Sequence, residues 1–216
     1  MASAEQIQQY EQKWAQAADT AFAVLDSSDW DKQKSKDKDC EIYLRHEKGS
    51  SFAQVKSVVT INAPISTVEE NLKTTKVVDK NTPKEEREGN IERRIVSQVN
   101  DGADAAGFFY IAVESPSSLV SPREFLMYQK LTRRDGKIAL IRTSIENDDI
   151  QKTAKGNVRG NMHFQAFIAE SVNDSTTKLC FVCHADPCGK IPSMVYNSAA
   201  TNQGYSALRL KRDIEK

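Results

Sequence analysis

The stretch that decides the fold is His184-Ala-Asp-Pro-Cys-Gly-Lys-Ile-Pro-Ser-Met-Val-Tyr-Asn-Ser-Ala-Ala-Thr-Asn202. Apolar residues from Lys178 to Ala185 predict a strand that runs into it, and Asp186-Pro-Cys-Gly189 has the residue types of a turn. Pro192 suits the first turn of a helix, where a backbone N–H has no intrahelical partner. We expect that closing helix to run from Met194 to about Ile214. A long helix entered directly from a strand indicates a curved sheet closed over one helix, which can enclose a cavity.

Length and charge narrow the classes of function. The chain has 216 residues, with 30 basic and 30 acidic side chains. This length suits one domain with a core and room for a pocket. Because the charges balance, no overall field would attract nucleic acid or an anionic membrane. We therefore expect no nucleic-acid partner, and only local, apolar contact with membranes.

The first residues and the cysteines bear on location. Met1 to Ile7 lacks the apolar core of a signal peptide, and no apolar run is long enough for a spanning helix. The four cysteines show no spacing typical of a disulfide framework. The expectation is a cytoplasmic monomer that meets membranes only transiently.

Hydrophobic periodicity predicts helices on either side of a run of strands. Apolar residues recur at three- and four-residue steps from Ile7 to Leu25, which indicates an opening helix. The charged segment from Asp26 to Asp39 is typical of a solvated loop. Turn residues separate the later apolar runs, so the class is α+β with an antiparallel sheet. The expected strands cover residues 41–47, 52–61, 91–99, 107–114, 124–133, 137–146, 157–172 and 178–185, and a short helix begins at Ala63-Pro64.

Three motifs follow one another in the second half of the chain. They are Ser121-Pro-Arg-Glu-Phe125, Gly156-Asn-Val-Arg-Gly160 and Asp186-Pro-Cys-Gly-Lys-Ile-Pro-Ser-Met-Val-Tyr-Asn197. Together they resemble the START (steroidogenic-acute-regulatory-related lipid-transfer) domain, and the last motif is most similar to that of phosphatidylcholine-transfer-type members. The resemblance implies one START-like domain over residues 1–216 with a helix-grip fold. In that fold a curved antiparallel sheet wraps around a long C-terminal helix and leaves an internal apolar tunnel.

The resemblance also implies a function. The protein would bind and transfer one lipid inside cells, whether a phospholipid, a sterol or another apolar molecule. Residues 1–25 would form the N-terminal helix and residues 190–214 the C-terminal gating helix. The loop from Glu114 to Pro122 would complete the gate, with Leu119 and Val120 contacting the membrane. A loop packed back onto the sheet is the alternative.

Alternation along the strand 124–133 separates two faces. Phe125, Met127 and Gln129 share one face, and the resemblance turns that face toward the tunnel. Gln129 and Tyr110 stand near the positions where sterol-carrying members have a base and an acid, so a sterol held by that charge pair is not expected. Neighbouring strand residues point to opposite faces, so His163 or Phe164 would line the tunnel. The expected ligand-binding residues are Tyr110, Phe125, Met127, Gln129, His163, Phe164, Met194, Val195 and Ser198.

Phosphatidylcholine is not secured as the ligand. In choline-phospholipid-binding members an arginine precedes a tryptophan after the short helix, and aromatic rings surround the quaternary ammonium. Those positions fall near Thr75 and Val78 here, so the arginine is missing, although Lys73 and Lys76 are close. Arg123 and Arg159 are interpreted as structural salt-bridge formers, because an unpaired buried arginine is costly.

Haem attachment, metal binding and nucleophilic catalysis do not fit the sequence. Cys180-Phe-Val-Cys183-His184 has the spacing of c-type haem attachment, but strand residues three apart point to opposite faces. We therefore expect no cofactor and no metal site. No Gly-x-Ser-x-Gly elbow occurs and no histidine is placed beside a nucleophile, so no catalytic residue is assigned. Two alternatives stay open: a lipid-sensing interaction module without transfer, and a cavity enzyme of the cyclase or thioesterase kind.

Overall fold

The computed structural model describes residues 2–115, 117 and 120–216, without the side chains of 198 and 199. These residues form one curved, almost wholly antiparallel sheet in the order β1-β2-β3-β10-β9-β7-β6-β5-β4, and β8 pairs with β6 in parallel. The strands are β1 (Asp31–Gln33), β2 (Glu41–Arg45), β3 (Gln54–Ile61), β4 (Asn90–Asn100), β5 (Ala106–Val113), β6 (Arg123–Arg134), β7 (Lys137–Ser144), β8 (Val158–Arg159), β9 (Asn161–Asn173) and β10 (Thr176–Asp186).

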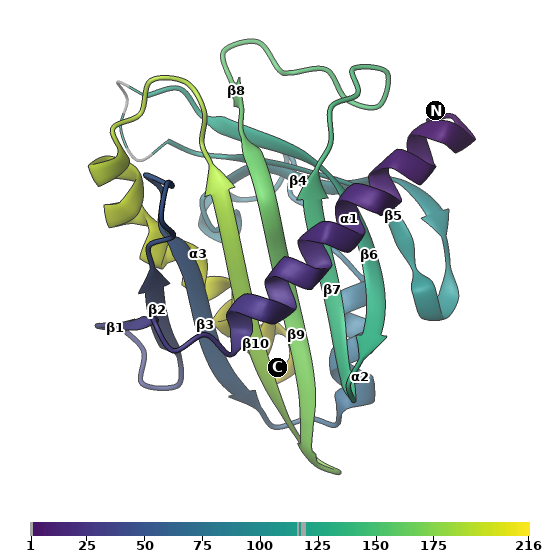
Figure 1. Cartoon of the computed structure of the whole chain (residues 1–216), viewed down its shortest axis with the longest axis vertical. Helices are drawn as coiled ribbons and strands as arrows, with labels where there is room; N and C mark the ends of the chain where they lie inside the picture. The colour runs from purple at the N-terminus through teal and green to yellow at the C-terminus, as the bar shows by residue number, and fades with distance from the viewer. Residues whose placement is uncertain (1, 116, 118–119) are drawn as a thin grey trace.

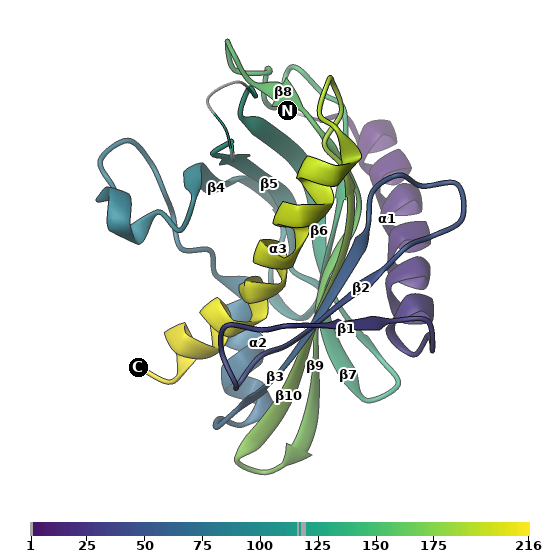
Figure 2. The ribbon, with the colours of Figure 1, turned by 90° about the vertical axis from the view of Figure 1, so that its left-hand side faces the viewer.

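Helices cover both faces of the sheet. α1 (Ala4–Leu25) lies across the outer face, while α3 (Ser193–Ile214) and the short α2 (Ile65–Lys73) lie on the inner, concave face (Figures 1 and 2). Two single-turn 3₁₀ helices, η1 (Lys84–Glu86) and η2 (Gly102–Asp104), flank β4. The predicted α+β helix-grip fold is therefore confirmed. Among the described residues, no helix is long and apolar enough to cross a membrane.

Strand alternation divides the core into an inner and an outer layer. Inner side chains of β3, β6, β7 and β10 pack with α3, whereas Ala139, Ala166 and Val182 face the small residues of α1. Cys180 lies in the outer layer and Cys183 in the inner one, as their spacing predicted. α1 is held by a capping box between Ser3 and Gln6, and also by a hydrogen bond of 3.0 Å from Trp14 Nε1 to the carbonyl of Ile141.

Two strand predictions need correction. The charged segment 26–39, expected to be a loop throughout, contributes the short edge strand β1, which pairs with β2. The strand expected over 157–172 is broken at Gly160 into β8 and β9. A Cβ atom at Gly160 would lie 2.5 Å from Cε1 of Phe125, so the backbone passes where only glycine fits.

The three sequence motifs interlock in space around the start of β6. Glu124, fully buried, accepts hydrogen bonds from Asn157 Nδ2 at 2.9 Å and from Arg159 Nη2 at 2.8 Å, both in the second motif. Its neighbour Arg123 donates to the carbonyl oxygens of Pro187 at 2.7 Å and Cys188 at 3.0 Å, in the third motif. The first motif thus ties the 150–160 loop and the turn before α3 to the sheet.

Only one of the two expected structural salt bridges forms. Arg159 pairs with Glu124, as predicted. Arg123 instead donates to backbone carbonyls, including that of Ser121, and no ion pair joins it to a described carboxylate. Carbonyl oxygens satisfy this buried guanidinium because a tight turn presents several of them at once.

α3 approaches the sheet closely at Gly204. The Gly204 carbonyl accepts a hydrogen bond of 2.6 Å from the buried Ser57 hydroxyl of β3. A Cβ atom at this position would lie 3.1 Å from Cγ2 of Ile42 in β2. Because Gly204 has no side chain, α3 can lie this close to β2 and β3.

We expect Gly204→Val to lower the free energy of unfolding by about 1–3 kcal/mol, because its branched side chain would overpack against Ile42. Urea unfolding measures this loss. Asn202→Val, on the exposed side of the same helix, is the control for helix propensity and should change stability by less than about 0.7 kcal/mol. Adding Ile42→Val should recover part of the loss, and equal destabilisation by both single variants would contradict the close approach.

Glu124→Gln is a second test. Burial opposes ionisation of Glu124, but hydrogen bonds from Asn157 and Arg159 outweigh it, so the pKa of this carboxyl lies below its ordinary value. A lowered folded-state pKa stabilises the fold above the unfolded pKa of about 4.3, and this contribution is lost as pH falls through the folded pKa. We expect Glu124→Gln to lower the free energy of unfolding by about 2–3 kcal/mol at neutral pH.

The pH profile of unfolding supplies the control for that test. Wild-type stability should fall on acidification below about pH 4.3, and the fall should be shallower in Glu124→Gln, which lacks the titrating group. Glu114→Gln, at an exposed carboxylate, should keep the wild-type profile. An unchanged acid slope in Glu124→Gln would refute the role of the buried carboxylate.

Candidate functional site

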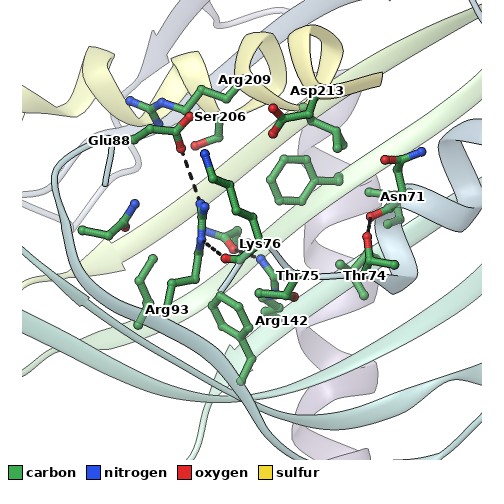
Figure 3. Close-up of a pocket in the computed structure, with 18 residues that line it drawn as sticks. Asn71, Thr74, Thr75, Lys76, Glu88, Arg93, Arg142, Ser206, Arg209 and Asp213 are labelled. Atoms are coloured by element: carbon green, nitrogen blue, oxygen red, sulfur yellow. Dashed lines mark hydrogen bonds and ion pairs between the residues drawn. The ribbon is translucent and has the colours of Figure 1, made fainter. Parts of the chain in front are cut away.

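A cavity of about 400 Å³ lies between the concave face of the sheet and the C-terminal half of α3 (Figure 3). Three parts of the fold build it, namely the end of α2 with the residues after it, the sheet from β4 to β9, and α3, and Glu88 before β4 adds to the lining. From the sheet come Asn90, Arg93, Phe109, Ile111, Leu140, Arg142, Gln165 and Phe167, and from α3 come Ser206, Arg209, Leu210 and Asp213.

The floor of the cavity differs from its mouth. Phe109, Leu140 and Leu72 on the floor are buried, whereas Lys76 and Asp213 at the mouth are exposed. A ligand inside would touch apolar surface at depth and polar groups toward solvent. This division is the usual one for cavities that bind small molecules.

Arg142 is the exception on the apolar floor. Its side chain is only 8% exposed, and its Cζ lies 3.8 Å from the centre of the Phe109 ring. Nε donates to Gln129 Oε1 and Nη1 donates to Gln165 Oε1, each at 2.9 Å. Both acceptors are neutral amides. Among the described residues, no carboxylate forms an ion pair with this guanidinium.

Burial and the nearby positive charge of Arg93 lower the pKa of Arg142 to about 9. The guanidinium therefore still carries its positive charge at neutral pH. Arg93 itself donates to the Lys76 carbonyl at 2.8 Å and lies 3.6 Å from Glu88. Asp213 at the mouth pairs at 2.6 Å with Lys216, a residue that does not line the cavity.

Of the expected ligand-binding residues whose side chains are described, none lines this cavity. Phe125 and Met127 share the inner face, the side that the resemblance implied, but they pack in the core cluster with Tyr196 and Ala200 of α3. The N-terminal half of α3 is thus packed against the sheet, and the cavity lies beside its other half. Gln129 also faces inward and reaches the cavity through its hydrogen bond to Arg142.

Tyr110 lies on the other face of the sheet. Its β-ladder partner is Leu126 of the outer layer, and its hydroxyl donates to Glu124 Oε2 at 2.9 Å. The expectation of a tunnel-facing hydroxyl is therefore corrected. Tyr110 belongs to the network that joins the sequence motifs.

His163 and Phe164 do not obey simple alternation. The register between β9 and β10 shifts between His184 and Ala185, so an extra residue is accommodated here, as in a β-bulge. Phe164 packs in the cluster under α1, and the ring of exposed His163 lies 4.6 Å from that of His184. Neither side chain lines the cavity, which corrects the expectation for both.

Three more expected residues are described: Met194 and Val195 in the first turn of α3, and Val120 shortly before β6. Met194 is 82% exposed, and Val195 and Val120 are half-buried. Leu119 and the side chain of Ser198 lie outside the described residues. Contact of these residues with a ligand or a membrane stays a prediction.

Arg142 is the site residue that sequence reasoning missed. The signal was present in Ile138-Ala-Leu-Ile-Arg-Thr-Ser144, where Ile138, Leu140 and Arg142 share one face of the strand. A charged residue in the apolar row of a buried strand needs a partner or a function. The sterol-type comparison had directed attention to Gln129, whereas the positive charge comes from the adjacent strand and touches that glutamine.

The described residues contain no group of three or more His, Cys, Asp or Glu side chains that could hold a metal ion. His184, the most buried histidine, bonds Ser50 Oγ through Nε2 at 3.1 Å on the outer side of the sheet. The cavity lining that the structure describes contains neither histidine nor cysteine.

A curved sheet that grips a C-terminal helix beside an internal cavity defines a class of ligand-enclosing domains. The START domain family model matches residues 23–209, and the chain belongs to this family. No curated protein sequence matches significantly.

Solved structures share the fold. Human StAR-related lipid transfer protein 5 superimposes with a TM-score of 0.75 at 17% identity, over 96% of this chain and 97% of that one. Human STARD10 gives 0.71 at 13% identity, over 93% and 78%. A fragment of a STAR-related lipid transfer protein from Xanthomonas axonopodis gives 0.67 at 16% identity, over 88% and 100%.

Proposed function

We propose that this START domain binds one lipid in the cavity beside α3 and carries it between membranes. The observation that carries the proposal is the cavity itself, with its apolar floor of Phe109, Leu140 and Phe167 beneath α3. The names of the structural relatives, two of which are lipid transfer proteins, support the same function.

The physical requirement for such a carrier is enclosure. A chain of about 16 carbons exposed to water costs on the order of 13 kcal/mol, at about 0.8 kcal/mol per methylene group. A cavity between sheet and helix removes this cost without any catalytic group. The proposed role is therefore binding and exchange rather than chemical conversion of the lipid.

Exchange requires the cavity to open, and we place the gate between the 114–122 loop and α3. Met194 in the first turn of α3 is 82% exposed, which gives this end of the helix an apolar group for contact with a bilayer. A second route lies beside the polar mouth of the cavity, where Val77 is 59% exposed. Movement of α3 away from the sheet would open either route.

A cavity-filling substitution tests where the lipid binds. We expect Ser206→Trp to abolish binding, because the indole would occupy the cavity that Ser206 lines. Native mass spectrometry after incubation with liposomes should show one lipid per wild-type chain and none on this variant. Asn202→Trp, one turn earlier on the exposed side of α3, should bind like the wild type.

The outcomes separate the competing functions. A wild-type chain that stays lipid-free under these conditions, or a folded Ser206→Trp variant that binds normally, would contradict the proposal. A chain that holds lipid but never exchanges it between vesicles would be a sensor rather than a carrier. A changed mass of the bound molecule would indicate an enzyme.

The gate is tested by charge on exposed apolar residues. We expect Met194→Asp to slow lipid transfer between vesicles about tenfold, because a carboxylate at the membrane-contact end disfavours insertion. Val172→Asp is the matched control, since this exposed valine lies at the end of β9 and should leave transfer unchanged. If Val77→Asp slows transfer and Met194→Asp does not, the gate is at the cavity mouth instead.

A further inference from the structure

We infer that the cavity selects a single-chain lipid whose head carries a negative charge, a carboxylate or a phosphate, and that Arg142 binds this charge. The inference rests on the proposed function and adds the ligand class. Its chemical basis is a positive charge on the cavity floor with no negative partner.

Arg142 forms hydrogen bonds but has no anionic partner among the described residues. Arg142 is only 8% exposed. Its two hydrogen bonds go to the neutral side chains of Gln129 and Gln165. Moving an arginine out of water is costly, and neutral dipoles compensate only part of that cost. A carboxylate or phosphate would supply the missing charge and can accept two parallel N–H bonds.

The guanidinium also has donors to spare. Nε and Nη1 make the two bonds to glutamine, and no hydrogen bond from Nη2 to a described residue occurs. Among the described residues, every fully buried side-chain nitrogen or oxygen has a hydrogen-bond partner. Because Nη2 makes no such bond, it is not fully buried. Arg142 lines the cavity, so Nη2 is open to that space. The aromatic face of Phe109 holds the guanidinium plane in place from one side.

The charges around the cavity favour an anion as well. Four cationic side chains line it, Lys76, Arg93, Arg142 and Arg209, against the two acids Glu88 and Asp213. Both acids already have cationic partners, in Arg93 and Lys216. A neutral head would leave the repulsion between Arg93 and Arg142 unrelieved, whereas an anionic group between them would relieve it.

The volume of the cavity limits the tail. A space of about 400 Å³ lies near the lower end of the range for small-molecule sites, roughly 300–1,000 Å³. One acyl chain therefore fits this space better than the two chains of a phospholipid. Leu72, Ile111, Phe167 and Leu210 offer apolar surface for one such chain.

Two lipid pairs provide the test, and in each pair the chain is the same while one head is anionic and the other is neutral. Affinities of the wild-type chain are measured for palmitoyl-lysophosphatidate against monopalmitoylglycerol, and for palmitate against palmityl alcohol, below the concentrations at which these lipids aggregate. We expect the acidic member of at least one pair to bind about tenfold tighter or better, from charge-assisted hydrogen bonds. Equal affinity within both pairs would overturn the inference.

Arg142→Met supplies the residue-level test. The variant should lose the preference for acid while keeping affinity for monopalmitoylglycerol, and its thermal stability should be equal or higher, since an unpaired buried charge is replaced by an apolar chain of similar length. Arg94→Met is the matched control. Arg94 also lies over an aromatic ring, that of Tyr110 at 5.3 Å, but on the other face of the sheet. It should keep the preference, and an acid preference that survives in Arg142→Met would overturn the inference.

Two further arms separate the sources of failure. Inorganic phosphate that binds the wild type as tightly as lysophosphatidate does would show a site for free anions and overturn the lipid assignment. Tight binding of neutral and acidic lipids alike would refute only the role of Arg142 and leave the proposed function intact. Absence of binding by every lipid in the panel would refute both.

Discussion

The buried carboxylate of Glu124 and its neighbour Arg123 hold two distant segments against the sheet. Glu124 binds the 150–160 loop through Asn157 and Arg159, and Arg123 binds the turn that leads into α3. An ionised group without partners would be costly in this interior, so the segments that satisfy it must be in place together. The position of α3 on the sheet, and with it the shape of the cavity, depends on this network.

The two halves of α3 have different surroundings. The N-terminal half packs against the sheet, and the C-terminal half lies beside the cavity. Tyr196 and Ala200 pack against Phe125 and Met127, and Gly204 allows contact with Ile42. Beyond Gly204, Ala207 and Leu208 still pack in the core, while Ser206, Arg209 and Asp213 line the cavity that Arg142 faces. The fold thus accepts, beside this cavity, a buried charge with no anionic partner among the described residues. Natural proteins commonly place such costly groups where a ligand compensates them.

Much of the architecture could be predicted because periodicity reports local burial. The alternation in β3, β6 and β10 and the helical pattern from Ile7 to Leu25 agree with the structure. The site was harder to predict. Tyr110 was assigned to the wrong face of β5 by analogy, since nothing in that apolar strand marks which face is concave. The bulge beside His163 was not visible either, because a register shift depends on the paired strand and not on the strand's own sequence.

The sequence by itself determined the helix-grip architecture, the family and the alternation along regular strands such as β6, because these follow from short-range periodicity and from motifs that stand whole in the chain. Only the tertiary structure decided where the interior is hollow. Whether Arg142 meets a carboxylate or two glutamines depends on which side chains three different strands bring together. Charge compensation is a property of that neighbourhood in space, and no one segment of the sequence records it.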